Sequence, residues 1–198
     1  MSTLLLTGFE PFLDVSLNPS GEVARRLDGA SLGPGVSVVG QVLPVSFGRA
    51  PAMLEAALGA IEADALAVVS LGVHRGAAFR LEERARAVFE SEQPDNDGAR
   101  GGSIRLPGPP ERRPRVDLDA CEGWLRRAGA AEVVRSDDAG GYLCERIFRA
   151  GLDLAEPLGV PALFLHVPPV ERTGVDDQTR VVRGFLESLA GSLEPPAP

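Results

Sequence analysis

The chain has little of the residue types that mark membrane-spanning or nucleic-acid-binding proteins. No apolar run approaches the roughly 20 residues that a membrane-spanning helix needs. The net charge is −8 over 198 residues, and arginines are interleaved with acidic residues or occur in short runs. Such a chain offers no basic patch to neutralise phosphates. We therefore expect neither a membrane nor a nucleic acid as partner.

Cysteine is also scarce, and the amino terminus lacks the features of an export signal. There are only two cysteines, and residues 1–6 (MSTLLL) contain neither a basic segment nor a cleavage site. These residues are predicted to form a first strand. Without an export signal, both cysteines are expected to be reduced thiols in a cytoplasmic protein.

Aromatic residues make up only 5% of the chain, although 44% of it is hydrophobic. The core must therefore consist largely of alanine, valine and leucine, which suits helices packed on a parallel sheet. Strand-like and helix-like segments alternate from end to end. We predict a single-domain α/β/α sandwich over residues 1–192, with a mostly parallel, twisted central sheet. The proline-rich residues 193–198 are predicted to be a frayed tail.

The elements follow from hydrophobic periodicity and helix-capping signals. Asn18 and Pro19, for example, are a favoured cap and first helical residue. An irregular excursion is expected at residues 90–115, as a functional loop or an interface element. Strands are predicted at residues 4–6, 36–45, 65–71, 131–134 and 161–167, and helices at 19–29, 50–63, 118–128, 141–155 and 175–189.

Cys144 is the candidate nucleophile. It follows the Gly140-Gly141 turn, in what is predicted to be the first turn of a helix. Free N–H groups and the positive end of the helix dipole at that position favour an anion, so the thiol pKa is expected to be lowered. Cys121 stands between acidic residues inside a predicted helix, and its thiol pKa is expected to be raised. Cys144 can also be explained as an inert buried cysteine.

A thiol nucleophile needs a base, and the chain has two histidines to supply it. His166 ends a predicted strand 22 residues after Cys144, and that strand directly follows the helix that Cys144 begins. His74 also follows a strand and is the rival base. Chain order favours His166, because a strand–helix–strand unit returns to the same edge of a parallel sheet. Glu82 and Glu83 are nearby candidates for the orienting carboxylate, and composition does not choose between them.

Several short motifs follow one another along the chain. They are TGFEPF at residues 7–12, NPS at 18–20, LPVSF at 43–47, Glu83-Arg84, PDN at 94–96, AGGYLC at 139–144 and FLHVP at 164–168. In this order and with this spacing, they together resemble the motifs of the pyrrolidone carboxyl peptidases, which are also called pyroglutamyl peptidase I and are cysteine peptidases.

The resemblance implies a triad of Cys144, His166 and Glu83, and removal of an N-terminal pyroglutamyl (5-oxoprolyl) residue from peptides. Cys144 would attack the pyroglutamyl carbonyl, His166 would carry a proton to the leaving amine, and Glu83 would orient the imidazole. Backbone N–H groups of residues 141–144 are the candidate oxyanion donors. No metal or cofactor is expected. The family also implies a homo-oligomer, often a tetramer.

The same resemblance implies a small pocket for the flat lactam ring, with aromatic walls and a few hydrogen bonds. Two positions depart from the family. Val73 stands where the family has a glutamine associated with lactam recognition, and Glu145 stands beside the nucleophile where the family has an asparagine. Two alternatives therefore remain, a thiol hydrolase of altered specificity and a non-catalytic binding protein with this fold. The predicted substrate-binding residues are Phe9, Phe12, Asn18, Val73, Tyr142 and Leu143.

Overall fold

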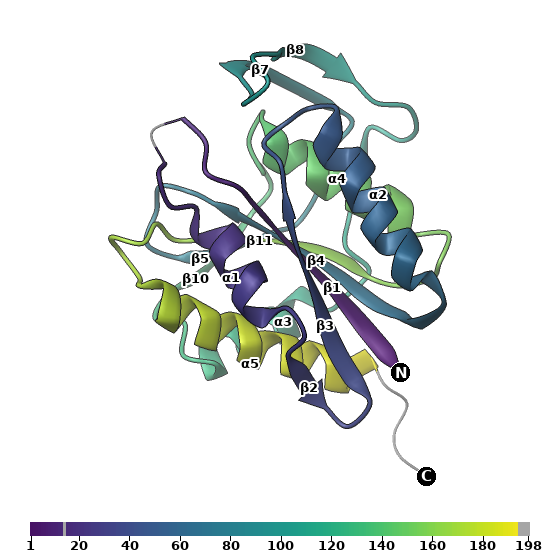
Figure 1. The fold of residues 1–198 in the computed structure, drawn as a ribbon, viewed down its shortest axis with the longest axis vertical. Coiled ribbons are helices and arrows are strands. Elements are labelled where there is room, and N and C mark those ends of the chain that lie inside the picture. Colours follow the sequence, from purple (N-terminus) through teal and green to yellow (C-terminus); the bar gives the residue numbers. More distant parts are fainter. Residues whose placement is uncertain (14, 194–198) are drawn as a thin grey trace.

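A computed structural model describes residues 1–13 and 15–193 and shows a seven-stranded sheet between two layers of helices (Figure 1). The strand order is β10-β5-β11-β4-β1-β3-β2. β11, β4, β1 and β3 run parallel, β10 is parallel to β5, and the two antiparallel pairings are β5 with β11 and β2 with β3. The predicted α/β class with a mostly parallel sheet is confirmed.

The sheet strands are β1 (Ser2–Phe9), β2 (Ser31–Gly33), β3 (Val36–Leu43), β4 (Ala65–Val73), β5 (Phe79–Glu82), β10 (Val133–Ser136) and β11 (Ala162–Val167). The remaining strands form two small antiparallel pairs, β6 (Ala85–Arg86) with β9 (Glu111–Arg112), and β7 (Val88–Pro94) with β8 (Arg100–Arg105). The helices are α1 (Pro19–Leu27), α2 (Arg49–Ile61), α3 (Leu118–Arg127), α4 (Leu143–Ala155) and α5 (Val175–Leu193), with a short 3₁₀ turn at Glu62–Asp64.

Successive side chains of each strand point to opposite faces of the sheet and feed two separate cores. On one face, Leu163 and Leu165 of β11 pack with α1, α3 and α5. On the other face, Phe164 of the same strand packs with α2 and α4. Figure 1 shows the two helix layers on opposite sides of the sheet. Every side chain of β11 is buried, as expected for a strand covered on both faces.

The predicted helices and strands match observed elements to within a few residues, but the short strands β2, β5, β6 and β9 and the β7–β8 hairpin were not anticipated. β5 was missed because it has only four residues and alternates apolar with charged side chains. The excursion at residues 90–115 is not irregular throughout, since it contains most of the β7–β8 hairpin at the top of Figure 1. Of the predicted tail, residues 194–198 lie outside the described residues.

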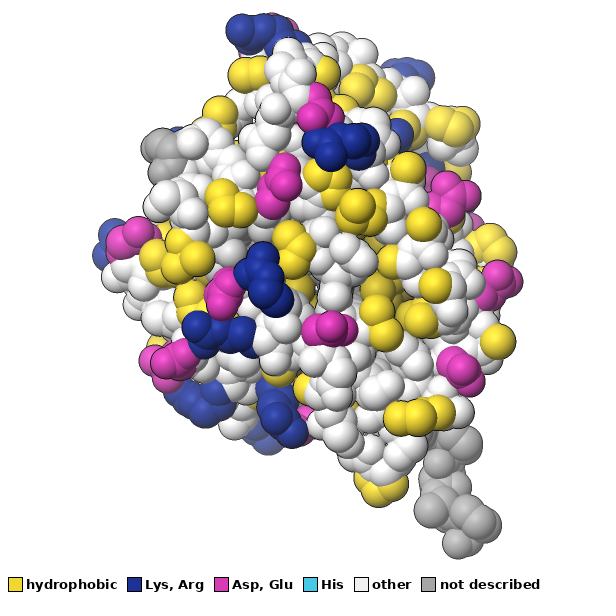
Figure 2. Space-filling view, viewed as in Figure 1, with side chains coloured by type: hydrophobic (Ala, Val, Ile, Leu, Met, Phe, Trp, Pro, Cys, Tyr) yellow, Lys and Arg dark blue, Asp and Glu magenta, His cyan; other side chains and the backbone are white. Residues whose placement is uncertain are grey.

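Acidic and basic side chains are interspersed over the face shown in Figure 2. Many charged side chains of the protein pair at its surface, as Arg26 does with Glu22 and Arg126 with Glu122, each four residues apart on a helix. Within the described residues, no helix is long and apolar enough to cross a membrane.

Candidate active site

The two residues that sequence order pairs, Cys144 and His166, meet at the carboxyl end of the parallel strands. His166 is the next-to-last residue of β11, and Cys144 is the second residue of α4. Gly72 of β4 pairs with His166 in the sheet. A Cβ built on Gly72 would lie 2.8 Å from Cys144 Sγ and 3.0 Å from His166 Cδ2. The glycine thus leaves the space in which the thiol and the imidazole converge.

The carboxylate that contacts His166 belongs to Glu82, which corrects the assignment to Glu83. His166 Nδ1 donates to Glu82 Oε1 across 2.7 Å, and both side chains are buried. Glu83 instead faces Arg135, with 3.7 Å between its Oε1 and Arg135 Nη1. The reason is strand alternation: Glu82 ends β5 on the face that carries His166, so the next residue is directed toward the opposite face.

The electrostatics of Cys144 differ from the expectation. Burial raises its thiol pKa to about 12, and the charge of Glu82 adds to the rise. Burial also lowers the pKa of His166, against the opposing effect of Glu82. The predicted lowering of the Cys144 pKa by the helix terminus is therefore wrong, because desolvation outweighs it. The resting site pairs a thiol with a neutral imidazole. For Cys121 the predicted rise is confirmed, to about 12 through burial.

Alkylation of Cys144 by iodoacetamide is accordingly expected to accelerate with pH across the neutral range. Below the thiol pKa, the reactive thiolate increases about tenfold for each pH unit. Rates of Cys144 labelling, followed by mass spectrometry between about pH 6 and pH 9, measure this. A rate that reaches its plateau below neutrality would contradict the raised pKa.

Glu145 lies beside the nucleophile, but its carboxylate is neutralised locally. Its side chain is fully buried and accepts hydrogen bonds from Arg86: from the backbone N at 2.6 Å, from Nε at 3.0 Å and from Nη2 at 2.8 Å. Arg86 belongs to β6, so this pair fastens the start of α4 to the segment that follows β5. Burial raises the pKa of Glu145, and its charge contributes to the raised pKa of Cys144.

Arg86→Met is expected to lower the free energy of unfolding by about 2–3 kcal/mol. The substitution leaves the Glu145 carboxylate buried with one backbone hydrogen bond, and breaking a buried ion pair typically costs about 3–5 kcal/mol. The lower value applies because Arg86 is partly exposed. Urea denaturation measures the change, and adding Glu145→Gln to Arg86→Met should recover part of it. A change below about 0.5 kcal/mol would contradict a stabilising pair.

A small pocket lies beside Cys144. All six residues predicted to bind the substrate line it, together with Cys144 and Val45. Asn18 has its amide committed to the backbone: Nδ2 donates to the Glu10 carbonyl, and Oδ1 accepts from Ser20 N. The walls of the pocket are therefore mainly apolar. The pocket residues are Phe9, Phe12, Asn18, Val45, Val73, Tyr142, Leu143 and Cys144.

Tyr142 connects the pocket wall to the loops around it. Its ring meets Phe47 edge-on at 5.4 Å between centroids, and Phe12 lies 6.2 Å away. Its hydroxyl donates to the Pro94 carbonyl across 2.9 Å. The buried Asp95 next to it accepts from Phe47 N at 2.9 Å. The turn at residues 94–96 thus holds the aromatic wall in place. Sequence reasoning had not singled out Val45, which lines the pocket, or Phe47, which packs against Tyr142.

The turn before α4 is shaped by two glycines. Gly140 has φ +85°, which L side chains rarely adopt. A Cβ on Gly141 would lie 2.1 Å from the Glu90 carbonyl oxygen, so the hairpin packs directly against this turn. Within the described residues, the cap residue Tyr142 makes no side-chain cap to α4. The first N–H groups of α4 therefore remain available to a ligand at the sulfur.

His74, the rival base, is committed elsewhere. Its Nε2 donates to the Ala78 carbonyl at 2.6 Å, and its Nδ1 accepts from Gly76 N at 3.2 Å. Its ring stands 5.9 Å from that of His166. These bonds shape the loop after β4, so His74 supports the site without a free nitrogen for proton transfer.

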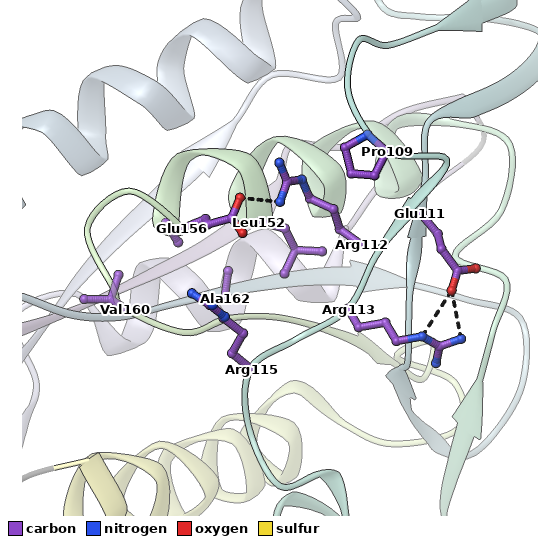
Figure 3. Close-up of a pocket in the computed structure, with 10 residues that line it drawn as sticks. Pro109, Glu111, Arg112, Arg113, Arg115, Leu152, Glu156, Val160 and Ala162 are labelled. Carbon is purple, nitrogen blue, oxygen red and sulfur yellow. Dashed lines mark hydrogen bonds and ion pairs between the residues drawn. The ribbon is translucent and has the colours of Figure 1, made fainter.

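Other hollows lie outside the Cys144 pocket, and two of them bear on the site. A larger groove shares Phe12 and Val73 with it and continues past His74. The other hollow, shown in Figure 3, lies where β11 begins, at the opposite end of that strand from His166. Four of its charged side chains form two ion pairs, Arg112 with Glu156 and Arg113 with Glu111. Within the described residues, no group of three or more histidine, cysteine or acidic side chains is placed to hold a metal ion.

Comparison with known proteins agrees with this geometry. The pyroglutamyl peptidase family model (Peptidase_C15) matches residues 2–188. The pyrrolidone-carboxylate peptidase of Cupriavidus pinatubonensis is 36% identical over 98% of this chain and 94% of its own, and that of Pyrococcus furiosus is 32% identical over 87% and 84%. The solved pyrrolidone carboxyl peptidase of Thermococcus litoralis superposes with a TM-score of 0.88 at 26% identity, covering 98% of this chain and 95% of its own. The chain therefore belongs to the pyroglutamyl peptidase family of cysteine peptidases.

Proposed function

We propose that this peptidase removes an N-terminal pyroglutamyl residue with Cys144 as nucleophile, His166 as base and proton carrier, and Glu82 as the positioning carboxylate. The observation that carries the proposal is the convergence of Cys144 Sγ and His166 on the space above Gly72, with His166 Nδ1 bonded to Glu82. That bond fixes the imidazole tautomer and leaves Nε2 for proton transfer.

In the first step, His166 Nε2 takes the thiol proton as the sulfur attacks the pyroglutamyl carbonyl. The resting pair is neutral because the thiol pKa is high and the imidazole pKa is low. Either the thiol therefore loses its proton as the sulfur attacks, or substrate binding shifts the proton equilibrium of Cys144 and His166 toward the ion pair. The carbonyl oxygen becomes an oxyanion at the amino end of α4. The N–H groups of residues 141–144 are the candidate donors, each contributing roughly 3 kcal/mol where it acts.

In the second step, the tetrahedral intermediate collapses and the peptide bond breaks. His166 gives its proton to the leaving amine, and the pyroglutamyl group remains on Cys144 as a thioester. Water, deprotonated by His166, then attacks the thioester carbonyl, releases pyroglutamate and restores the thiol. No metal or cofactor takes part in this scheme.

Substrate recognition is proposed to combine ring burial with chain exit through the larger groove. The 5-oxoproline ring would lie in the apolar pocket between Phe9, Phe12 and Tyr142. The leaving amine must lie near His166, and the groove on that side is lined by Val73 and His74. The remaining peptide would therefore run along the groove. Val73 supplies shape to the pocket but no side-chain hydrogen bond.

A fluorogenic 5-oxoprolyl amide, compared with the prolyl amide, tests the proposal. The prolyl control carries a charged amine and lacks the lactam carbonyl, and burying an unpaired charge in an apolar pocket is costly. We expect turnover of the 5-oxoprolyl amide only, and loss of that turnover after iodoacetamide treatment. Labelling of Cys144 without turnover would favour a thiol hydrolase of altered specificity. The absence of both labelling and turnover would favour a binding protein.

We also propose that the protein is a cytoplasmic homo-oligomer, a tetramer by family resemblance. The support is the resemblance itself together with the protruding β7–β8 hairpin, which offers edge strands to a neighbour. Light scattering coupled to size-exclusion chromatography measures the assembly, and a monomeric mass near 20.8 kDa at micromolar concentration would reject it.

A further inference from the structure

Arg80 contacts both partners of the imidazole–carboxylate pair. It lies directly opposite His166 in the antiparallel pairing of β5 with β11. Arg80 also lies two residues before Glu82 on β5, so the side chains of Arg80 and Glu82 point to the same face of the sheet. Arg80 Nε donates to Glu82 Oε1 across 2.8 Å, and its Nη2 lies 3.4 Å from His166 Nδ1. The guanidinium thus stands at the junction of the proposed positioning pair.

The contacts of Glu82 are unevenly distributed between its two oxygens. Oε1 accepts from both His166 and Arg80. Oε2 is buried and has no hydrogen-bond partner within the described residues. A fully buried carboxylate needs a compensating charge to stay ionised. Arg80 supplies a permanent one, so ionised Glu82 does not require His166 to be protonated.

A third contact fixes the guanidinium in place. Arg80 Nη2 donates to the Asp138 carbonyl in the loop that leads into α4, at 3.2 Å. Arg80 therefore links the carboxylate on β5 to the segment that positions Cys144. Its side chain is 26% exposed, so the link sits at the surface edge of a buried pair and is only partly screened by solvent.

We propose that Arg80 is a positioning residue that shares the Glu82 carboxylate with His166 and adds to the effect of burial in keeping the imidazole neutral between turnovers. This inference rests on the proposed function of Cys144, His166 and Glu82. A neutral imidazole is the form that can accept the thiol proton. By neutralising Glu82, Arg80 extends the range of pH in which that form predominates toward the acidic side.

The other charged groups around His166 do not replace Arg80. His74 is bonded to backbone groups, and Cys144 is a thiol at neutral pH. Glu145 is bound by Arg86, which also pairs with the side chain of Asp138. Arg80 is thus the cation in contact with Glu82 among the described residues, and its removal leaves that carboxylate to His166 alone.

The test is the protonation of His166 in Arg80→Gln. Loss of the nearby positive charge should raise the titration midpoint of the His166 imidazole by about 0.5–1 pH unit. This is the low end of the shift expected for charges a few ångströms apart, because Arg80 is partly exposed. Because the chain has only two histidines, imidazole NMR titration resolves them, and a His74→Gln variant assigns the signals. The acidic limb of the kcat/KM profile for the 5-oxoprolyl amide should shift by the same amount.

Arg84→Gln is the matched control. Arg84 donates to the carbonyl of Asp137 in the same loop, but its ion pairs are with Glu111 and Asp137. Arg84→Gln should leave the titration midpoint of His166 unchanged. Arg80→Lys, which keeps a positive charge, should give a midpoint close to the native one. Should Arg80→Gln fail to fold, Arg80→Met offers the same comparison.

A His166 midpoint within about 0.2 pH units of native in the folded neutral variant would overturn the inference, even if activity falls. That result would leave Arg80 a merely structural link. The NMR readout does not depend on turnover, so it remains decisive if the proposed peptidase activity is not found. Absence of turnover in the native protein would instead reject the proposed function.

Discussion

Cys144→Ser is expected to reduce kcat/KM for a 5-oxoprolyl amide by roughly 10⁴- to 10⁶-fold, as removal of a nucleophile does in hydrolases of this type. Serine is close in shape to cysteine, so the pocket and α4 should stay intact. Its hydroxyl has a far higher pKa than a thiol, and the neutral imidazole of His166 in this site is a weak base, since burial lowers its pKa. The serine hydroxyl is therefore less reactive for two reasons: it is harder to deprotonate, and it is a poorer nucleophile.

Cys121→Ala provides the control for this loss. Cys121 belongs to α3 and is fully buried in the core on the face of the sheet opposite to Cys144. It should cost stability through a small cavity but leave kcat/KM of the folded protein within about twofold. Labelling with iodoacetamide should disappear in Cys144→Ser and persist in Cys121→Ala. A Cys144→Ala protein with full activity would remove Cys144 from the mechanism.

Much of the fold could be predicted because its periodicity is local. β4 and β11 are continuous apolar runs, and α1 begins at an asparagine followed by proline, so pattern and capping chemistry agree. The order of Cys144 and His166 on consecutive elements also brought them to one edge of the sheet. These inferences needed no knowledge of long-range pairing.

The errors concern features that depend on tertiary structure. β5 has two apolar and two charged residues, and its pairing with β11 is antiparallel inside a mostly parallel sheet. Without that strand, nothing in the sequence showed which of two adjacent glutamates faces His166. An alternation of Phe79, Arg80, Leu81 and Glu82, apolar then charged, is the signal that could have identified both the strand and its face.

The pKa of Cys144 was misjudged for a similar reason. A helix terminus is visible in sequence, whereas the burial of a sulfur between a sheet and a pocket wall is not. The helix terminus is worth at most about 1–2 kcal/mol, while full desolvation of a charge costs more. Glu145 illustrates the same limit, because its partner Arg86 lies 59 residues away in the chain and only the fold brings them together.

Glu82→Gln and Glu83→Gln form the sharpest pair of substitutions in this chain, because adjacent residues of the same type have opposite expectations. Glu82→Gln should lower kcat by roughly 10³- to 10⁴-fold, as loss of the orienting carboxylate does in related triads. Glutamine can still contact His166 Nδ1, but it offers no charge to stabilise the imidazolium that forms. It can also donate to Nδ1 and so favour the wrong tautomer.

Glu83→Gln should keep kcat within about twofold. Its carboxylate lies 3.7 Å from Arg135, both groups are partly exposed, and Arg135 also pairs with Asp119 and Glu122. Such a pair contributes about 0–1 kcal/mol to stability. Steady-state kinetics of both variants, with urea denaturation to show that each is folded, separates the two residues. A large loss in Glu83→Gln with little change in Glu82→Gln would return the positioning role to Glu83. It would require His166 to leave its observed contact during catalysis.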